Sequence, residues 1–210
     1  MKKLLTLLAL TVSFSMNAQV STNSTSPTGI YASAMGNGTT ASGNESTAMG
    51  YDTTASGEAS TAMGYSTTAS TQASTAMGKL TTASGLNSTA MGYSSTASGS
   101  RSTAMGQSTT ASATFSTAMG LGTTASDYSS TVIGQYNSSG SSATSANSFS
   151  TSAPAFVIGD GTASNAKSDA FKVMFNGDAT VSNDLTVSGD VNITSDARLK
   201  SNIVSLGSTL

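Results

Sequence analysis

Side chains able to do acid–base or metal chemistry are few and scattered in this chain of 210 residues. It contains no Cys and no His, which excludes thiol chemistry, disulfides and histidine ligands. Four acidic residues, Glu45, Asp52, Glu58 and Asp127, stand alone in the first two thirds, whereas a glycosidase needs two facing carboxylates. We therefore expect no glycan hydrolase, no other enzyme and no cofactor.

Four aspartates in the last third, Asp160, Asp178, Asp184 and Asp190, stand beside glycine or asparagine and suggest calcium. Neither the calcium nonapeptide nor the twelve-residue helix–loop–helix pattern is present. Aspartate and asparagine also stabilise turns with their own side chains. The pattern favours turns, and no metal site is predicted.

A fourteen-residue repeat, S-T-A-M-G-x-x-T-T-A-S-G-x-x, dominates the sequence. Small residues fill its fixed positions, and its variable positions are expected at exposed corners. A register this strict is typical of stacked coils rather than of disorder. The methionines of the structural ladder are Met35, Met49, Met63, Met77, Met91, Met105 and Met119, and Ile133 closes the series.

Each coil is long enough for two strands of about five residues joined by tight turns. Glycines such as Gly50 and Gly57 fall where the turns are expected, because glycine accepts unusual backbone angles. The repeat thus predicts an all-β fold, a flattened parallel β-roll of seven or eight coils.

Alternation of side chains divides each coil into two sets. Thr47 and Met49 oppose Ala48, while Thr53 and Ala55 point together in the second strand. The alternation leaves open which set faces inward. We place the methionine inside, because it is the one substantial apolar group of each coil.

A roll this thin is marginal alone. Burying a methionine contributes about 1.5 to 3 kcal/mol, whereas ordering costs about 1 to 2 kcal/mol for every residue. Several chains around a common axis would bury a second ladder, so we expect a homotrimer.

The first nineteen residues have the pattern of a secretory signal peptide. Lys2 and Lys3 precede a short apolar run that ends in small and polar residues near Ala18. The run is too short to span a bilayer, and no membrane span is expected in the mature chain. A mildly acidic chain without a basic cluster also argues against nucleic acid as a partner.

The repeat resembles the head repeat of trimeric autotransporter adhesins, which carries valine and isoleucine where this chain has Thr47 and Met49. The resemblance covers residues 30–134. It implies a left-handed β-roll, three identical chains, a place at the bacterial surface, and binding to extracellular matrix or host surfaces. No heptad stalk follows the repeats, so self-anchoring by that family's route is not predicted.

We thus expect a secreted or surface-exposed trimeric fibre that mediates attachment to a host protein, matrix protein or surface glycan. Tyr51, Tyr65 and Tyr93 form its candidate contact line, since tyrosine gives contact area at small entropic cost. A purely structural role for these tyrosines, stacked to support the turn, remains open.

The alternative is a solenoid that binds ice or a carbohydrate surface through a flat threonine ladder. That ladder would consist of Thr39, Thr53, Thr67, Thr81, Thr109 and Thr123, with Ser95 interrupting it.

Beyond the head of residues 20–134, residues 135–155 are rich in Ser and Asn and predict a flexible or loosely packed linker. Residues 156–194 predict short strands and hairpins of a trimeric neck like a β-prism.

The end of the chain, residues 195–210, resembles the opening of the intramolecular chaperone domain of phage endosialidases and tail spikes. The motif is S-D-A-R-L-K-S-N-I, starting at Ser195. The resemblance implies self-cleavage between Ser195 and Asp196, with Ser195 as nucleophile and Lys200 as base. Because only the start of that domain is present, we expect the motif to be inactive here. Its ancestry again favours a trimer. A further alternative function is a tail-fibre-like protein whose C-terminal chaperone cleaves itself.

Overall fold

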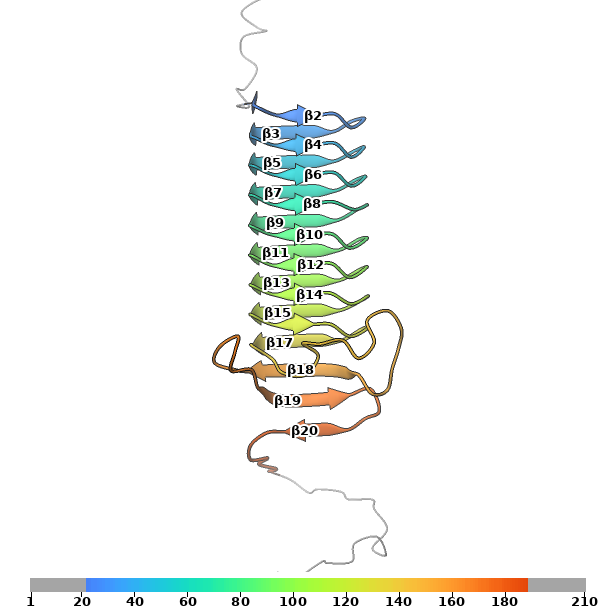
Figure 1. The fold of residues 1–210 in the computed structure, drawn as a ribbon, viewed down its shortest axis with the longest axis vertical. Helices are drawn as coiled ribbons and strands as arrows, with labels where there is room; N and C mark the ends of the chain where they lie inside the picture. The colour runs from blue at the N-terminus through green and yellow to red at the C-terminus, as the bar shows by residue number, and fades with distance from the viewer. Residues whose placement is uncertain (1–21, 189–210) are drawn as a thin grey trace, which may run out of the picture.

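The computed structural model describes residues 22–188, and all regular secondary structure in that part is β. Figure 1 shows a rod of stacked coils, each with one long and one short strand. Each complete repeat contributes a strand of five residues and a strand of two. The long strands are β3 (Ser33–Asn37), β5 (Thr47–Tyr51), β7 (Thr61–Tyr65), β9 (Thr75–Lys79), β11 (Thr89–Tyr93), β13 (Thr103–Gln107), β15 (Thr117–Leu121) and β17 (Thr131–Gln135). The short strands are β2 (Ser26–Pro27), β4 (Thr40–Ala41), β6 (Thr54–Ala55), β8 (Thr68–Ala69), β10 (Thr82–Ala83), β12 (Thr96–Ala97), β14 (Thr110–Ala111) and β16 (Thr124–Ala125).

Two parallel sheets form the walls of the solenoid. One has twelve strands and runs from β1 (Thr22–Asn23) through the long strands to β20 (Ala179–Val181), and the other contains the eight short strands. Within the repeats all strand pairs are parallel. Equivalent residues lie one above the other, so that Met91 pairs with Met77 on one side and with Met105 on the other. The predicted parallel β-solenoid with a fourteen-residue coil is confirmed.

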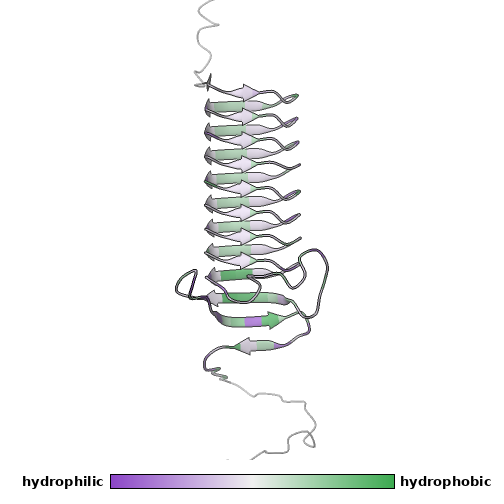
Figure 2. Cartoon of the chain, viewed as in Figure 1, coloured by the Kyte–Doolittle hydropathy of each residue, from purple (hydrophilic) through white to green (hydrophobic). Residues whose placement is uncertain are grey.

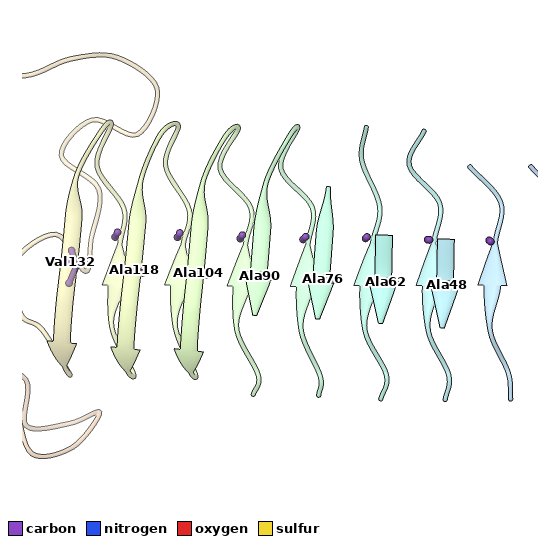
Figure 3. Packing of buried hydrophobic residues seen from close by; sticks show 14 of the residues in the cluster. Ala48, Ala62, Ala76, Ala90, Ala104, Ala118 and Val132 are labelled. Atoms are coloured by element: carbon purple, nitrogen blue, oxygen red, sulfur yellow. The ribbon is translucent and has the colours of Figure 1, made fainter. Parts of the chain in front are cut away.

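The interior is lined by small residues, and our placement of the methionines inside the coil is wrong. Ala48 and Ala55 are fully buried, and the same two alanines repeat along the rod until Val132 and Val157 take over. Figure 3 shows this column from Ala48 to Val132. Met49 points the other way and is only half-buried. The two walls lie close enough to pack alanine on alanine, which leaves no space for a thioether chain.

Threonine is also inside, so the predicted exposed threonine ladder is wrong. The six threonines of that ladder are each fully buried, as is Ser95. The alternation of side chains along a strand explains this burial. Each of these residues lies two positions before the buried alanine of a short strand, and residues two positions apart point to the same face. A flat ice-binding or carbohydrate-binding face cannot be made of these side chains.

Glycine serves mainly for close approach between coils. A Cβ at Gly57 would lie 1.9 Å from the backbone oxygen of Thr71 in the next coil, and one at Gly92 would lie 2.1 Å from that of Gly106. Most of the left-handed corners fall on other residues, such as Asp52 (φ 53°) and Ala59 (φ 52°). The requirement for glycine at position 57 therefore comes less from the turn than from the short distance to the backbone of the next coil.

Residues 135–155 cap the end of the solenoid. The side chain of Asn137 is buried and lies against the last short strand, accepting from Thr124 N at 2.7 Å and donating to Thr124 O at 2.8 Å. Ser126 N donates to Gly140 O at 2.9 Å. These bonds satisfy the edge of β16, which would otherwise be open.

A buried carboxylate fixes the rest of this cap. Asp127 is fully buried, and its Oδ1 accepts from Thr144 N at 2.5 Å and from Ser145 N at 2.7 Å. Tyr128 N also donates to Ser145 O. The segment predicted as a loosely packed linker is thus held on the rod at several points.

The large sheet continues beyond the repeats with strands of larger residues. β18 (Pro154–Asp160) pairs in parallel with β17, whereas β19 (Asp169–Met174) and β20 (Ala179–Val181) are antiparallel. The predicted short strands near residues 156 and 171 are confirmed. Leu185 and Val187, expected in a further strand, are exposed and lie outside any strand.

The signal peptide of residues 1–19 and the motif of residues 195–210 lie outside the described residues. Within residues 22–188, no helix is long and apolar enough to cross a bilayer.

Candidate functional site

The outer face of the twelve-stranded sheet carries a continuous apolar column. The methionine ladder forms most of it, with every methionine half-buried and in register with its neighbours. Ile133 pairs with Ile158, and Ile158 pairs with Phe171, so the column continues into β19. Figure 2 shows the long strands as more hydrophobic than the short ones, with strong green in β17 and in parts of β19, which also carries a purple stretch. We call the residues from Met35 to Phe171 in this column the outer apolar column.

The predicted contact tyrosines lie in one line, two residues along each strand from the methionine column. Tyr51, Tyr65 and Tyr93 are 51%, 46% and 44% exposed. Tyr51 and Tyr65 stack with ring centroids 5.1 Å apart and planes 9° apart. Lys79 fills the coil between Tyr65 and Tyr93, with its Nζ 5.4 Å from one ring centroid and 5.8 Å from the other.

This tyrosine–lysine column differs from the predicted aromatic line in a way that matters for binding. The facing sides of the rings are covered by one another or by Lys79, which favours cation–π and stacking contacts within the column. The ring edges and the other exposed atoms of the column remain for a partner. Lys79 was not included in the predicted line. Its spacing of fourteen residues from both Tyr65 and Tyr93 indicates that it belongs to the same column.

A second aromatic cluster lies at the opposite corner of the coil near the cap. Phe115 is 43% exposed, Arg101 lies 5.3 Å over its ring, and Tyr128 meets it edge-on at 5.6 Å. Sequence reasoning did not single out this cluster. Its signal was again the spacing, since Arg101 and Phe115 are fourteen residues apart.

The acidic residues do not form a reactive pair. Glu45, Asp52 and Glu58 are exposed at corners, as expected, but Asp127 is buried in the cap instead. Glu58 accepts a hydrogen bond from Gln72 at 3.1 Å. The described residues contain no group of three acidic side chains able to hold a metal ion.

Turn chemistry accounts for one of the four aspartates that suggested calcium. Asp178 N donates to Asn176 Oδ1 at 3.0 Å, and Asn176 Nδ2 donates to Asp178 Oδ2 at 2.7 Å. Asp160 accepts from Ser168 Oγ at 2.6 Å. Asp184 is exposed, and Asp190 lies outside the described residues.

The predicted self-cleavage residues, Ser195 and Lys200, also lie outside the described residues. Their roles stay a prediction from the resemblance of the motif.

Comparison with family models matches four stretches of this rod. Each matches the YadA head domain repeat in two copies, at residues 28–53, 55–81, 83–109 and 111–137. The last match ends at Asn137 and so includes the first three residues of the cap. A search of curated proteins found no relative.

The four matches together cover half of the chain and coincide with the stacked coils, with small residues inside and the methionine ladder outside. The chain therefore belongs to the YadA head repeat family, the heads of trimeric autotransporter adhesins.

Proposed function

We propose that this protein is a homotrimeric, surface-exposed or secreted fibre that mediates attachment, and that it acts as a structural and binding protein rather than as an enzyme. The observation that carries the proposal is the outer apolar column, which runs along the whole rod and is uncovered in a single chain.

The column gives chains a reason to associate. The interior holds only alanine, serine and threonine for most of its length, so little apolar area is buried by one chain. Each half-exposed methionine can contribute about 1 kcal/mol more when a neighbouring chain covers it. Repeated in seven coils and continued by Ile133, Ile158 and Phe171, this stabilises a parallel assembly in which equal coils meet.

Threefold symmetry is supported by the family, whose adhesins are homotrimers. A closed ring of three also covers every outer column, because each chain turns the same face to a common axis.

The mass of the native protein in solution tests the assembly. The mature protein should have three times the mass of its single chain when it is measured by light scattering on a sizing column. Replacing Met77 and Met91 by lysine should convert the trimer to monomers, because six charges would meet at the axis.

The matched control places the same charges on the other wall. Thr82 and Thr96 are also half-buried and outward, at the outer side of the small sheet. Thr82→Lys with Thr96→Lys should keep the trimer. A monomeric wild type would reject the assembly, and equal behaviour of the two double variants would reject the methionine column as its interface.

We further propose the tyrosine–lysine column as the contact surface for a host or matrix protein. Its support is the exposure of the tyrosines and their alignment at one edge. Replacing Tyr51, Tyr65 and Tyr93 together by serine should abolish binding to a surface coated with reconstituted extracellular matrix while the trimer persists.

Three threonines on the small sheet, Thr54, Thr68 and Thr96, serve as the control when replaced by serine. If the tyrosine variant still binds the matrix-coated surface, the tyrosines are not the contact site and only stack to support the turn.

A further inference from the structure

A polar pocket of about 480 Å³ lies where the cap meets the last two strands. Its walls come from Ser138 and Ser139 of the cap, from the loop after β18, and from β19 and β20. No proposed role of the rod uses it.

Both carboxylates of this pocket already accept hydrogen bonds. Asp169 uses both carboxylate oxygens, accepting from Ser138 N at 2.8 Å and from Ser139 N at 2.9 Å. Asp160 accepts from Ser168 Oγ at 2.6 Å, and Ser182 Oγ donates to the carbonyl of Asp169. The acidic side chains thus serve to build the walls.

The donors, in contrast, are free. Lys167 and Lys172 line the pocket, and neither ammonium group forms a hydrogen bond or ion pair with any residue between 22 and 188. The hydroxyl of Thr180 and the amide of Asn183 also line it. The lining thus holds two ammonium groups beside two carboxylates, and the carboxylates Asp160 and Asp169 already accept hydrogen bonds. A ligand with one negative group placed at the lysines, and with hydroxyls elsewhere, matches this arrangement.

We propose that this pocket binds an acidic sugar, through a carboxylate held by Lys172 and Lys167 and through hydroxyls held by the surrounding Ser, Thr and Asn side chains. The volume is in the range of small-molecule sites. Hydroxyl and amide walls suit a polyhydroxylated ring, whereas a nucleotide would require an apolar or aromatic wall for its base, and no aromatic residue lines the pocket.

The pocket stays open in the proposed assembly. Lys172 is directly opposite Val157, whose side chain points into the solenoid, and is therefore on the inner side of the sheet. Its neighbour Phe171 pairs with Ile158 on the outer side, in the outer apolar column. A trimer closed through that column leaves the lysines accessible.

Saturation-transfer NMR of the full chain with glucuronic acid as the probe tests the site, with glucose as its neutral counterpart. Glucuronic acid should bind and glucose should not. Raising the salt concentration should weaken binding, because the contact depends on charge. Lys172→Gln should lower the affinity on the order of tenfold, the usual loss for a hydrogen bond to a charged group.

Arg101→Gln, which removes a cation that does not line the pocket, is the matched control and should bind as the wild type does. Equal binding of glucose, no binding of glucuronic acid, or unchanged affinity of a folded Lys172→Gln variant would each overturn the proposal. Lys167→Gln provides a second variant should Lys172→Gln unfold. The proposal rests on the proposed function in one respect, namely that the sugar would come from a glycan on the contacted surface. The NMR experiment measures sugar binding in solution, so its failure can be distinguished from a failure of the protein to attach to a surface.

Discussion

The repeat body of residues 30–134 and the C-terminal region of residues 135–188 continue the same sheet by different means. In the repeat body, coils stack through backbone ladders, and alanine and glycine permit the close approach. In the C-terminal region the coil is interrupted. The side chains of Asn137 and Asp169, together with that of Asp127 in the last coil, supply the hydrogen bonds that the next coil would have made. Its strands carry larger apolar residues, such as Val157 on the inner side and Phe171 on the outer side. The comparison teaches that a regular stack needs small residues throughout its interior. Polar side chains that replace the missing hydrogen bonds of a next coil are needed only at its end.

The largest effect is expected inside the repeat body. Ala90→Asp places an unpaired charge in a fully buried position and should lower the free energy of unfolding by about 3 to 5 kcal/mol. Thermal unfolding followed by circular dichroism measures it. Thr89→Asp, outward and half-buried in the same strand, should cost far less. Similar losses in both variants would contradict the assignment of inside and outside.

Gly92 of the repeat body should matter more than Gly177 of the C-terminal region. Gly92→Ala adds a Cβ 2.1 Å from a neighbouring backbone oxygen at φ +110°, and should cost about 2 to 4 kcal/mol. Gly177→Ala has nothing within 4 Å and φ +93°, so only backbone strain of about 1 to 2 kcal/mol is expected. Chemical denaturation of both variants gives the difference. If both variants lose the same free energy of unfolding, the close approach of Gly92 to the neighbouring coil does not contribute to the loss.

A cap variant should act locally. Asn137→Ala removes the side chain that bonds Thr124 and Ser139, and should cost about 2 kcal/mol. Hydrogen exchange should accelerate at the Thr124 amide, which loses its acceptor. Asn147→Ala, which loses one exposed bond to Thr114, is the control and should leave that amide protected. Unchanged exchange in Asn137→Ala would show that the cap does not hold the sheet edge.

The smallest expected effect is a gain in stability. Ala73 has φ +51°, where alanine is strained by about 1 to 2 kcal/mol. Ala73→Gly relieves this strain but makes the unfolded chain more flexible, so a net gain of about 0.5 kcal/mol is expected. The control Ala83→Gly, in a buried strand position, should destabilise. A lower midpoint of thermal unfolding for Ala73→Gly would contradict the strain at this corner.

The cap shows where sequence reasoning stopped too early. The register appeared to end near Gln135, yet Asn137 lies fourteen residues after the buried Thr123, and Asp127 lies fourteen after the buried Ala113. Both polar residues thus occupy interior positions of the repeat. A side chain that can form hydrogen bonds at an interior position of the repeat indicates that the stack ends there. The backbone groups at the edge of the last sheet strand need hydrogen-bond partners, and such a side chain can supply them.

The sequence by itself determined the coil length, the parallel stacking, the two alternating sets of side chains and the division between fixed and variable positions. Backbone periodicity is local and appears directly in the spacing of residues. Only the tertiary structure decided which set faces inward, and it placed alanine and threonine inside and methionine outside. That choice depends on the distance between the two walls, which is set by packing across the coil rather than by any neighbour along the chain.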